Sequence, residues 1–190
     1  PSEVPAALDE CPADALKAHP FALLVLMRSM FNWRSIPKML ELKALLLTAM
    51  EEHPELPAEE RGNLLGECDL IMSFLCYNDI SAMSRLHRSA SAQMSRPAIS
   101  IRSSGGWTFG SPSVLMMFYR APGELAGELA EMAECMPHYY KITNGHGQGA
   151  ETIMRAEAAF MQGRFTDAHI ALESAYAQIE GNGQENMALC

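Results

Sequence analysis

The chain has 190 residues, of which 48% are hydrophobic and 19% are charged, and its formal net charge is -9. This length and composition indicate one globular domain over residues 1–190 and exclude an intrinsically disordered chain. The acidic balance lacks the basic footprint of a nucleic-acid binder, so we expect no direct contact with nucleic acid.

The apolar runs and the cysteines indicate where the protein resides. The longest clean apolar run, residues 21–27, is far shorter than the roughly 20 residues that cross a bilayer, and no charged-then-apolar leader opens the chain. Five scattered cysteines without a CxxC pair favour reduced thiols over a disulfide framework. We therefore expect a soluble, cytoplasmic protein with no membrane partner. Its first residue, Pro1, suggests a segment of something larger.

Helical periodicity dominates the chain, and the alternation typical of strands is nearly absent. Pro20 fits the first turn of one helix, and Asn78 and Asp79 end a later helix and cap its successor. The predicted helices cover residues 20–31, 36–52, 58–75, 80–94, 114–119, 123–136, 149–162 and 165–180. Residues 95–111 form an irregular insert.

A turn followed by helix-packing residues recurs four times. In the last unit the turn residue Gly163 is followed at +2, +5 and +12 by Phe165, Ala168 and Ala175. Equivalent turns at residues 34, 78 and 121 give intervals of 44, 43 and 42 residues. Their packing positions are Ile36, Met39 and Leu46; Ile80, Met83 and Ala90; and Gly123, Ala126 and Ala133. We predict an all-α fold, a right-handed α-solenoid of about four helical hairpins, with an irregular helical bundle as the alternative.

Positive charge is concentrated in the middle of this acidic chain. Between Asp79 and Glu124, 44 residues carry no acidic side chain but five arginines, namely Arg85, Arg88, Arg96, Arg102 and Arg120. Such a segment can attract an anionic ligand or an acidic face of a neighbouring domain, since arginine binds carboxylate and phosphate at two points. Alternatively, the arginines pair with acidic helices stacked beside them. The sequence leaves both interpretations open.

The irregular insert contains two aromatic residues, Trp107 and Phe109. Long loops inside compact helical domains are uncommon and tend to be functional or disordered, and the aromatic residues argue against disorder. One hypothesis has the insert folding over the concave side of the helices, with Trp107 and Phe109 near Arg102 and Arg120 in a ligand surface. The alternative is that both rings fill the gap left by a short third hairpin.

A glycine-rich turn over residues 144–149 precedes a predicted helix, so its backbone N–H groups are candidates to hold an anion. Alternate glycines also serve simply to turn the chain. Tyr139, Tyr140, Asn144 and His146 lie in or just before this turn and have the stacking and hydrogen-bonding groups that suit a sugar or another small polar inducer.

Catalysis by this segment is not expected. Cys135, His138 and His146 are the one cluster that approaches the composition of a metal site, but no second cysteine pair is present and Pro137 should break the helix between them. No nucleophile elbow or His-Glu-x-x-His sequence occurs. We therefore predict no metal and no catalytic residue, and an enzyme would require that this cluster hold a catalytic metal.

Two groups of residues resemble known proteins. Residues 156–168 read AEAAFMQGRFTDA and resemble a tetratricopeptide repeat, with small residues where paired helices cross and a glycine at the turn. The stretches WTFGSPS (107–113), ECMPHYY (134–140) and TNGHG (143–147), with MLELK (39–43) and GECDLIMSFL (66–75), resemble the central helical-repeat region of LuxR-family, MalT-like ATP-dependent transcriptional regulators of bacteria.

The resemblance implies a ligand-sensing and interdomain-coupling segment. In that family a signal-transduction ATPase precedes the repeats and a helix-turn-helix follows them, and neither is present in this sequence. ATP would then bind only to the absent ATPase domain, and no cofactor is expected here. The implied partners are an unknown small-molecule inducer or protein effector and the adjacent ATPase and DNA-binding domains, with a homo-oligomer left open. The alternative function is a stand-alone repeat adaptor that binds another protein.

Overall fold

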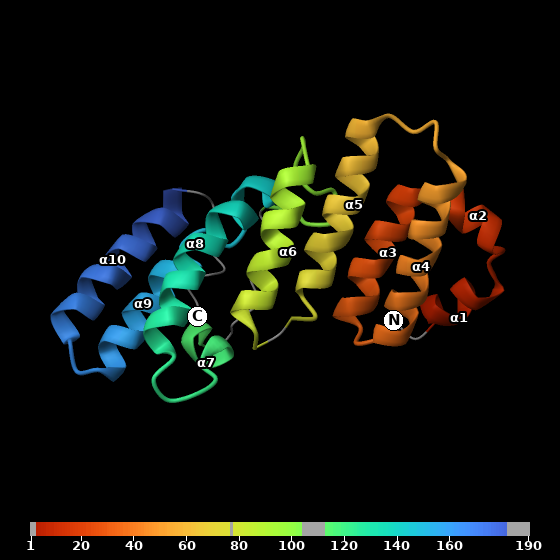
Figure 1. The fold of residues 1–190 in the computed structure, drawn as a ribbon. Helices are drawn as coiled ribbons and strands as arrows, with labels where there is room; N and C mark the ends of the chain where they lie inside the picture. Colours follow the sequence, from red (N-terminus) through yellow and green to blue (C-terminus); the bar gives the residue numbers. More distant parts are fainter. Residues whose placement is uncertain (1–2, 77, 104–112, 182–190) are drawn as a thin grey trace.

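The computed structural model describes residues 3–76, 78–103 and 113–181. In these ranges the regular secondary structure is entirely α-helical, and ten helices follow one another along an elongated body (Figure 1). They are α1 (Glu3–Glu10), α2 (Ala13–Lys17), α3 (Pro20–Asn32), α4 (Ile36–Glu52), α5 (Ala58–Ser73), α6 (Ile80–Gln93), α7 (Val114–Phe118), α8 (Leu125–Thr143), α9 (Ala150–Met161) and α10 (Phe165–Gly181). The all-α prediction is confirmed.

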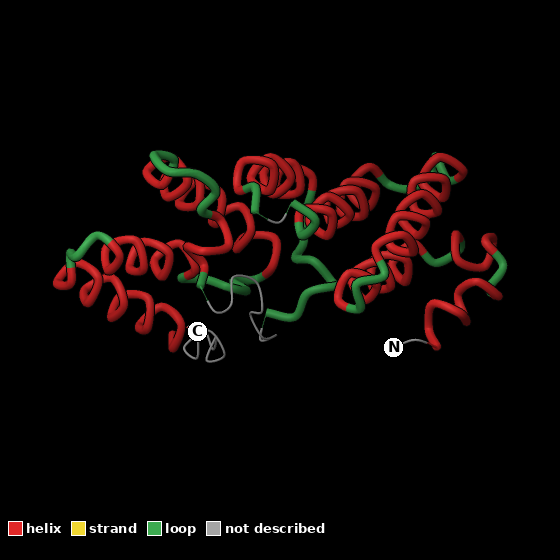
Figure 2. The backbone as a smooth tube through the Cα atoms, turned by 90° about the horizontal axis from the view of Figure 1, so that it is seen from below, coloured by secondary structure: helices red, strands yellow, loops and turns green. Residues whose placement is uncertain are grey.

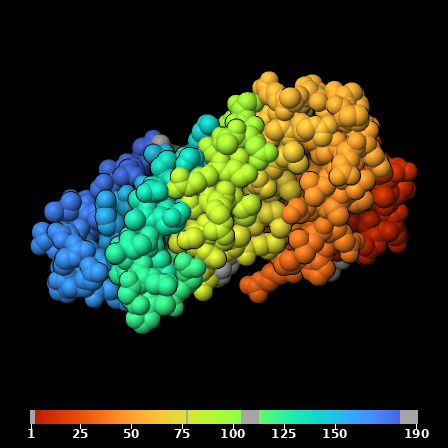
Figure 3. Space-filling model, viewed as in Figure 1, coloured from red at the N-terminus to blue at the C-terminus, as the bar shows by residue number. Residues whose placement is uncertain are grey.

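The helices follow one another along the body approximately in sequence order, except that α5 packs against α3 and α7 against α9. The space-filling view runs from the N-terminal helices at one end to α9 and α10 at the other (Figure 3). The pairs α3–α4, α5–α6 and α9–α10 each pack as hairpins, and α8 packs against both α6 and α9. Seen along a perpendicular direction, the helices lie side by side in a curved row (Figure 2). None of these helices is both long and apolar enough to cross a membrane, as far as the described ranges extend.

Local signals explain where the hairpins begin and end. Pro20 occupies the first turn of α3, and the Asp79 side chain caps α6 by accepting a hydrogen bond from the Ala82 N–H at 2.9 Å. The tight turns of the three hairpins contain residues with positive φ, namely Arg34 (59°), Asn78 (68°) and Gly163 (74°). These are the turn residues expected from the sequence pattern, and left-handed backbone is what such a helix-to-helix turn requires.

The third repeat unit was predicted in the wrong register. Ala126 and Ala133, expected to pack between helices, are exposed, whereas Glu128 and Cys135, two residues further along, are buried. The physical reason is that the left-handed turn residue is Gly123, with φ of 89°, rather than a residue at 121. The expected hairpin partner is different too, because α7 packs against α9.

Helix α8 continues through Pro137, which was expected to break it. A proline inside a helix leaves the carbonyl of the residue four positions earlier, here Ala133, without its N–H partner. Ala133 and Pro137 both lie on the exposed face of α8, so water can bind that carbonyl. The helix therefore reaches Thr143 and ends at Asn144, whose φ of 53° is left-handed.

Two hydrophobic cores share one helix. Leu64, Cys68 and Ile71 of α5 pack into the N-terminal core with α3 and α4, whereas Leu70 and Phe74 pack into the C-terminal core with α6 to α10. At their junction the Phe31 and Phe74 rings lie 5.5 Å apart, with the Arg28 guanidinium 4.7 Å from the Phe74 ring centre. Burial lowers the pKa of Arg28 from its ordinary value.

Helices α5 and α6 approach closely because two glycines of α5 face the end of α6. A Cβ atom at Gly62 would lie 2.8 Å from the backbone oxygen of Gln93. A Cβ at Gly66 would lie 2.5 Å from Cγ of Met94 and 3.1 Å from the oxygen of Ala90. Only a residue without a side chain fits at these two contacts.

Candidate functional site

Three of the five arginines in the positive segment pair with acidic side chains of neighbouring helices. Arg88 lies 3.1 Å from Glu134, Arg96 lies 3.4 Å from Glu67, and Arg120 lies 3.4 Å from Glu128. Arg120 also lies 3.2 Å from Asp79. These contacts agree with the structural interpretation of the segment, in which the arginines hold helices together.

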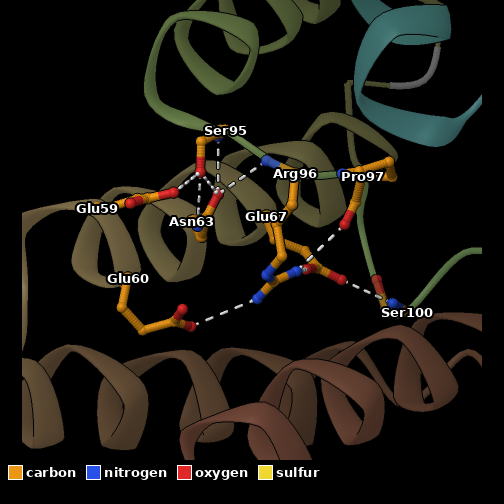
Figure 4. A network of polar contacts seen from close by, with 8 residues as sticks. All are labelled: Glu59, Glu60, Asn63, Glu67, Ser95, Arg96, Pro97 and Ser100. Atoms are coloured by element: carbon orange, nitrogen blue, oxygen red, sulfur yellow. Dashed lines mark hydrogen bonds and ion pairs between the residues drawn. The ribbon is translucent and has the colours of Figure 1, made fainter.

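The Arg96 contacts anchor the start of the irregular insert on α5 (Figure 4). Glu67 is 0% exposed and accepts hydrogen bonds from the Arg96 guanidinium at 3.4 Å and from the Ser100 N–H at 2.7 Å. The Asn63 side chain accepts from the Ser95 N–H at 2.8 Å. The guanidinium also lies 5.3 Å from the Phe21 ring centre of α3. The segment therefore joins α5 to the neighbouring hairpin.

Three of the four residues proposed to form a polar ligand site, Tyr139, Tyr140 and His146, make hydrogen bonds inside the protein, whereas Asn144 is exposed at the C-terminal end of α8. The buried Tyr139 hydroxyl is hydrogen bonded to His146 Nδ1 at 2.7 Å, and their rings pack edge to face. The Tyr140 hydroxyl donates to Glu151 and accepts from the Gly149 N–H at 3.2 Å. Burial is the main cause that raises the pKa of both tyrosines. The Tyr139–His146 and Tyr140–Glu151 hydrogen bonds each join α8 to the turn or helix that follows it, and so stabilise the α8–α9 turn.

The other predicted ligand residues are not joined to this cluster. Arg102 is exposed at the end of the described part of the insert. Trp107 and Phe109 lie outside the described residues. Arg120 lies near the other end of α8, beside Glu128.

A buried imidazole lies between α5, α6 and α8. The Ser73 hydroxyl donates to the Leu70 carbonyl at 2.6 Å, so at its 2.9 Å contact with His87 Nε2 it must accept, which assigns the proton to Nε2. Nδ1 is then an acceptor for the Cys135 thiol, 3.1 Å away. Burial, with a smaller repulsion from His138, lowers the pKa of His87 to about 3. His87 is a neutral, satisfied core residue.

We expect His87 to make stability depend on pH. The ordinary pKa of histidine is 6.5, so between about pH 6.5 and 3 the unfolded state binds one more proton than the folded state. The stability due to neutral His87 is therefore complete above this window and is lost as the pH falls through it, by up to about 1.4 kcal/mol per pH unit. Urea unfolding between about pH 7 and 5, where few carboxylates titrate, should show this slope in the wild type and a flatter one in His87→Gln. Equal slopes would contradict the assignment.

The thiols of Cys68 and Cys135 are unsuited to nucleophilic chemistry. Burial raises the pKa of Cys135 to about 12 and that of Cys68 to about 11. No three His, Cys, Asp or Glu side chains within the described ranges are placed to hold a metal ion. Cys135 and His146 instead have separate partners, His87 and Tyr139.

An open cleft lies between the first turn of α6 and the first two turns of α8. It holds about 420 Å³ and is lined by Ile80, Ser81, Arg120, Gly123, Glu124, Gly127, Glu128 and Glu131. Sequence reasoning identified Arg120 here but missed the carboxylates. The signal was the spacing of Glu124, Glu128 and Glu131, which places them on one face of a helix.

A second open feature is an apolar stripe on α10, made of Phe165, Leu172 and Tyr176. These side chains are 63%, 51% and 53% exposed, and the exposed Phe160 of α9 lies beside Phe165, with ring centres 5.6 Å apart. Of the residues predicted to pack in this repeat, Ala168 and Ala175 are buried, whereas Phe165 projects outward and Gly163 forms the turn.

No protein-family model, curated protein or solved structure matches the chain significantly.

Proposed function

We propose that this chain is the ligand-sensing and interdomain-coupling helical-repeat region of a LuxR-type bacterial transcriptional regulator, and that it is not itself an enzyme. The observation that carries the proposal is the apolar stripe on α10. Large apolar side chains that gather on one exposed helix face are a feature of interaction sites. The stripe lies on the terminal hairpin of the row, where a neighbouring domain of the same polypeptide would dock.

The proposal includes a right-handed α-solenoid of four tetratricopeptide-like hairpins. Support comes from the residues with positive φ that precede α4, α6, α8 and α10, at positions 34, 78, 123 and 163, which are 44, 45 and 40 residues apart. Stacked repeats contact mainly their neighbours, so a ligand that favours one arrangement of the hairpins would shift the population of the whole array. The attached domains would respond to that shift.

The first test is the coding sequence on both sides of this segment. A Gly-x-x-x-x-Gly-Lys-Ser/Thr loop upstream and a helix-turn-helix downstream are the expected result. If neither is encoded, the regulator proposal fails. The alternative, a stand-alone adaptor whose stripe binds a separate protein, would then be the better account.

The docking role of the stripe has its own test. In the full polypeptide, Leu172→Glu should place a charge in the interface and free the adjoining domain, so that limited proteolysis at the domain junction becomes at least tenfold faster. The isolated chain should keep its stability to within about 0.5 kcal/mol, because Leu172 is half exposed.

Ala177→Glu is the matched control for the docking test. This exposed residue of α10 follows Tyr176 directly and so lies about 100° around the helix from the stripe. It should leave the proteolysis rate unchanged. Equal rates in both variants would mean that the stripe contacts no neighbouring domain.

A further inference from the structure

The cleft between α6 and α8 has an open floor. A Cβ atom added at Gly123 or Gly127 would meet no atom within 4 Å. Gly127 lies in the first turn of α8, where alanine would be the better helix former, so packing gives no reason for a glycine there. The space above the two glycines, together with a cleft volume of about 420 Å³, is sufficient for a small ligand.

The charges around this floor favour a cation. Glu124, Glu128 and Glu131 line the cleft, and Arg120 is the single basic residue among the lining side chains. Arg120 is shared between Glu128, at 3.4 Å, and Asp79, at 3.2 Å. Among the described residues, Glu131 has one distant ion pair, 3.9 Å from the Arg88 guanidinium. Negative charge therefore exceeds positive charge along this wall.

Glu128 supplies an independent indication of a missing partner. Glu128 is 3% exposed. Its Oε1 accepts hydrogen bonds from the backbone N–H and the side chain of Arg120. Its Oε2 has no hydrogen-bond partner among the described residues. A buried carboxylate oxygen without a donor is costly, and native structures rarely leave one. An N–H donor entering the cleft would satisfy it, with Arg120 remaining on Asp79.

The arrangement suits an organic cation better than a metal ion. No three potential ligands in the described ranges are placed around a common point. Instead, the carboxylates follow one another along α8, with Glu124 and Glu128 separated by one turn, about 6 Å along the axis, and Glu131 about 4.5 Å further. An extended diamine with four methylene groups spaces its two nitrogens by about one helical turn.

We propose that this cleft binds a linear aliphatic di- or polyamine, with its ammonium groups on Glu124, Glu128 and Glu131 and its methylene chain over Gly123, Gly127 and Ile80. This proposal identifies the class of ligand for the proposed sensing function. Only the biological role of the site rests on that function. Binding itself is a property of this chain. It can therefore be measured whatever the neighbouring domains prove to be.

The test is calorimetric titration of the chain with spermidine and with putrescine at constant ionic strength, with magnesium chloride as the reference for non-specific screening. Saturable binding of one polyamine per chain is expected. Gly127→Leu fills the open floor and should weaken binding at least tenfold. Glu128→Gln, which removes the central charge, should also weaken binding at least tenfold. It replaces Gly127→Leu as the test variant if circular dichroism shows that Gly127→Leu does not fold.

The matched control is Glu134→Gln, which removes a carboxylate of α8 that pairs with Arg88 and lies outside the cleft. It should bind the polyamine as the wild type does. Absence of saturable binding, equal loss in Glu134→Gln and Glu128→Gln, or full displacement by magnesium at the same ionic strength would each overturn the inference. The regulator proposal fails separately, on the flanking coding sequence.

Discussion

Replacement of Arg96 by methionine is expected to lower the free energy of unfolding by about 3 kcal/mol, the lower end of the range for breaking a buried ion pair. The loss arises because Glu67, whose side chain is fully buried, then keeps only the Ser100 N–H as a partner within the described part of the chain. The start of the irregular insert should also be held less tightly on α5, since Arg96 lies between Glu67, Glu60 and the Phe21 ring, and only the Asn63 and Ser100 contacts would remain of those described. Urea unfolding followed by circular dichroism measures the change.

Two further variants separate the buried charge from loss of packing. Arg88→Met breaks the ion pair with Glu134, in which the two side chains are 43% and 70% exposed. It should lower the free energy of unfolding by less than about 1 kcal/mol. Glu67→Leu combined with Arg96→Met removes both charges and should recover much of the loss. If Arg96→Met and Arg88→Met cost the same, Glu67 does not depend on Arg96.

Alanine at Gly62 is expected to destabilise the protein by about 1–3 kcal/mol, although alanine is the better helix former. The new methyl group would lie 2.8 Å from the backbone oxygen of Gln93, and a backbone atom cannot move aside as a flexible side chain can. Helices α5 and α6 would have to separate, which would also disturb the glycine contact at Gly66. Thermal and urea unfolding measure the effect.

Gly127→Ala provides the comparison for the Gly62 variant. Both glycines lie within helices, but a Cβ at Gly127 meets open space, so this change should raise stability by about 0.5–1 kcal/mol. Opposite signs for the two variants are the expected result. A stabilising effect of Gly62→Ala would mean that the α5–α6 contact is looser than the structure has it.

The helices were predictable where the chain carries strong stop and start signals. Pro20, Asp79 and Gly163 mark boundaries that the structure reproduces, and α4 extends over Ile36–Glu52 as expected. The short helices α1 and α2 bury no residue and were missed, whereas the short helix α7 was predicted because all five of its residues are apolar. The prediction that Pro137 breaks α8 was wrong, because a helix can continue through a proline on its exposed face, and the sequence did not show which face of α8 meets water.

The candidate sites were harder to predict than the helices. Tyr139, Tyr140 and His146 have the chemistry of a ligand site, yet their hydrogen bonds close on one another in the interior. The α6–α8 cleft was missed because the third repeat unit was aligned on Ala121. That alignment placed Ala126 rather than Glu128 at the buried position. Only three-dimensional packing shows that one oxygen of Glu128 has no donor in the residues that the structure describes.

The helix shared by the two cores affects how the chain folds as it is synthesised. The faces of α3 and α4 that form the N-terminal core are complete once Glu52 has been added, but Leu64, Cys68 and Ile71 of α5 are needed to cover them. At 5–20 residues per second, the 19 residues from Glu52 to Ile71 take roughly 1–4 s on the ribosome. During this interval Met27, Leu42 and Leu46 lack their covering helix. Until α5 is added, the exposed apolar side chains make the nascent chain prone to aggregate.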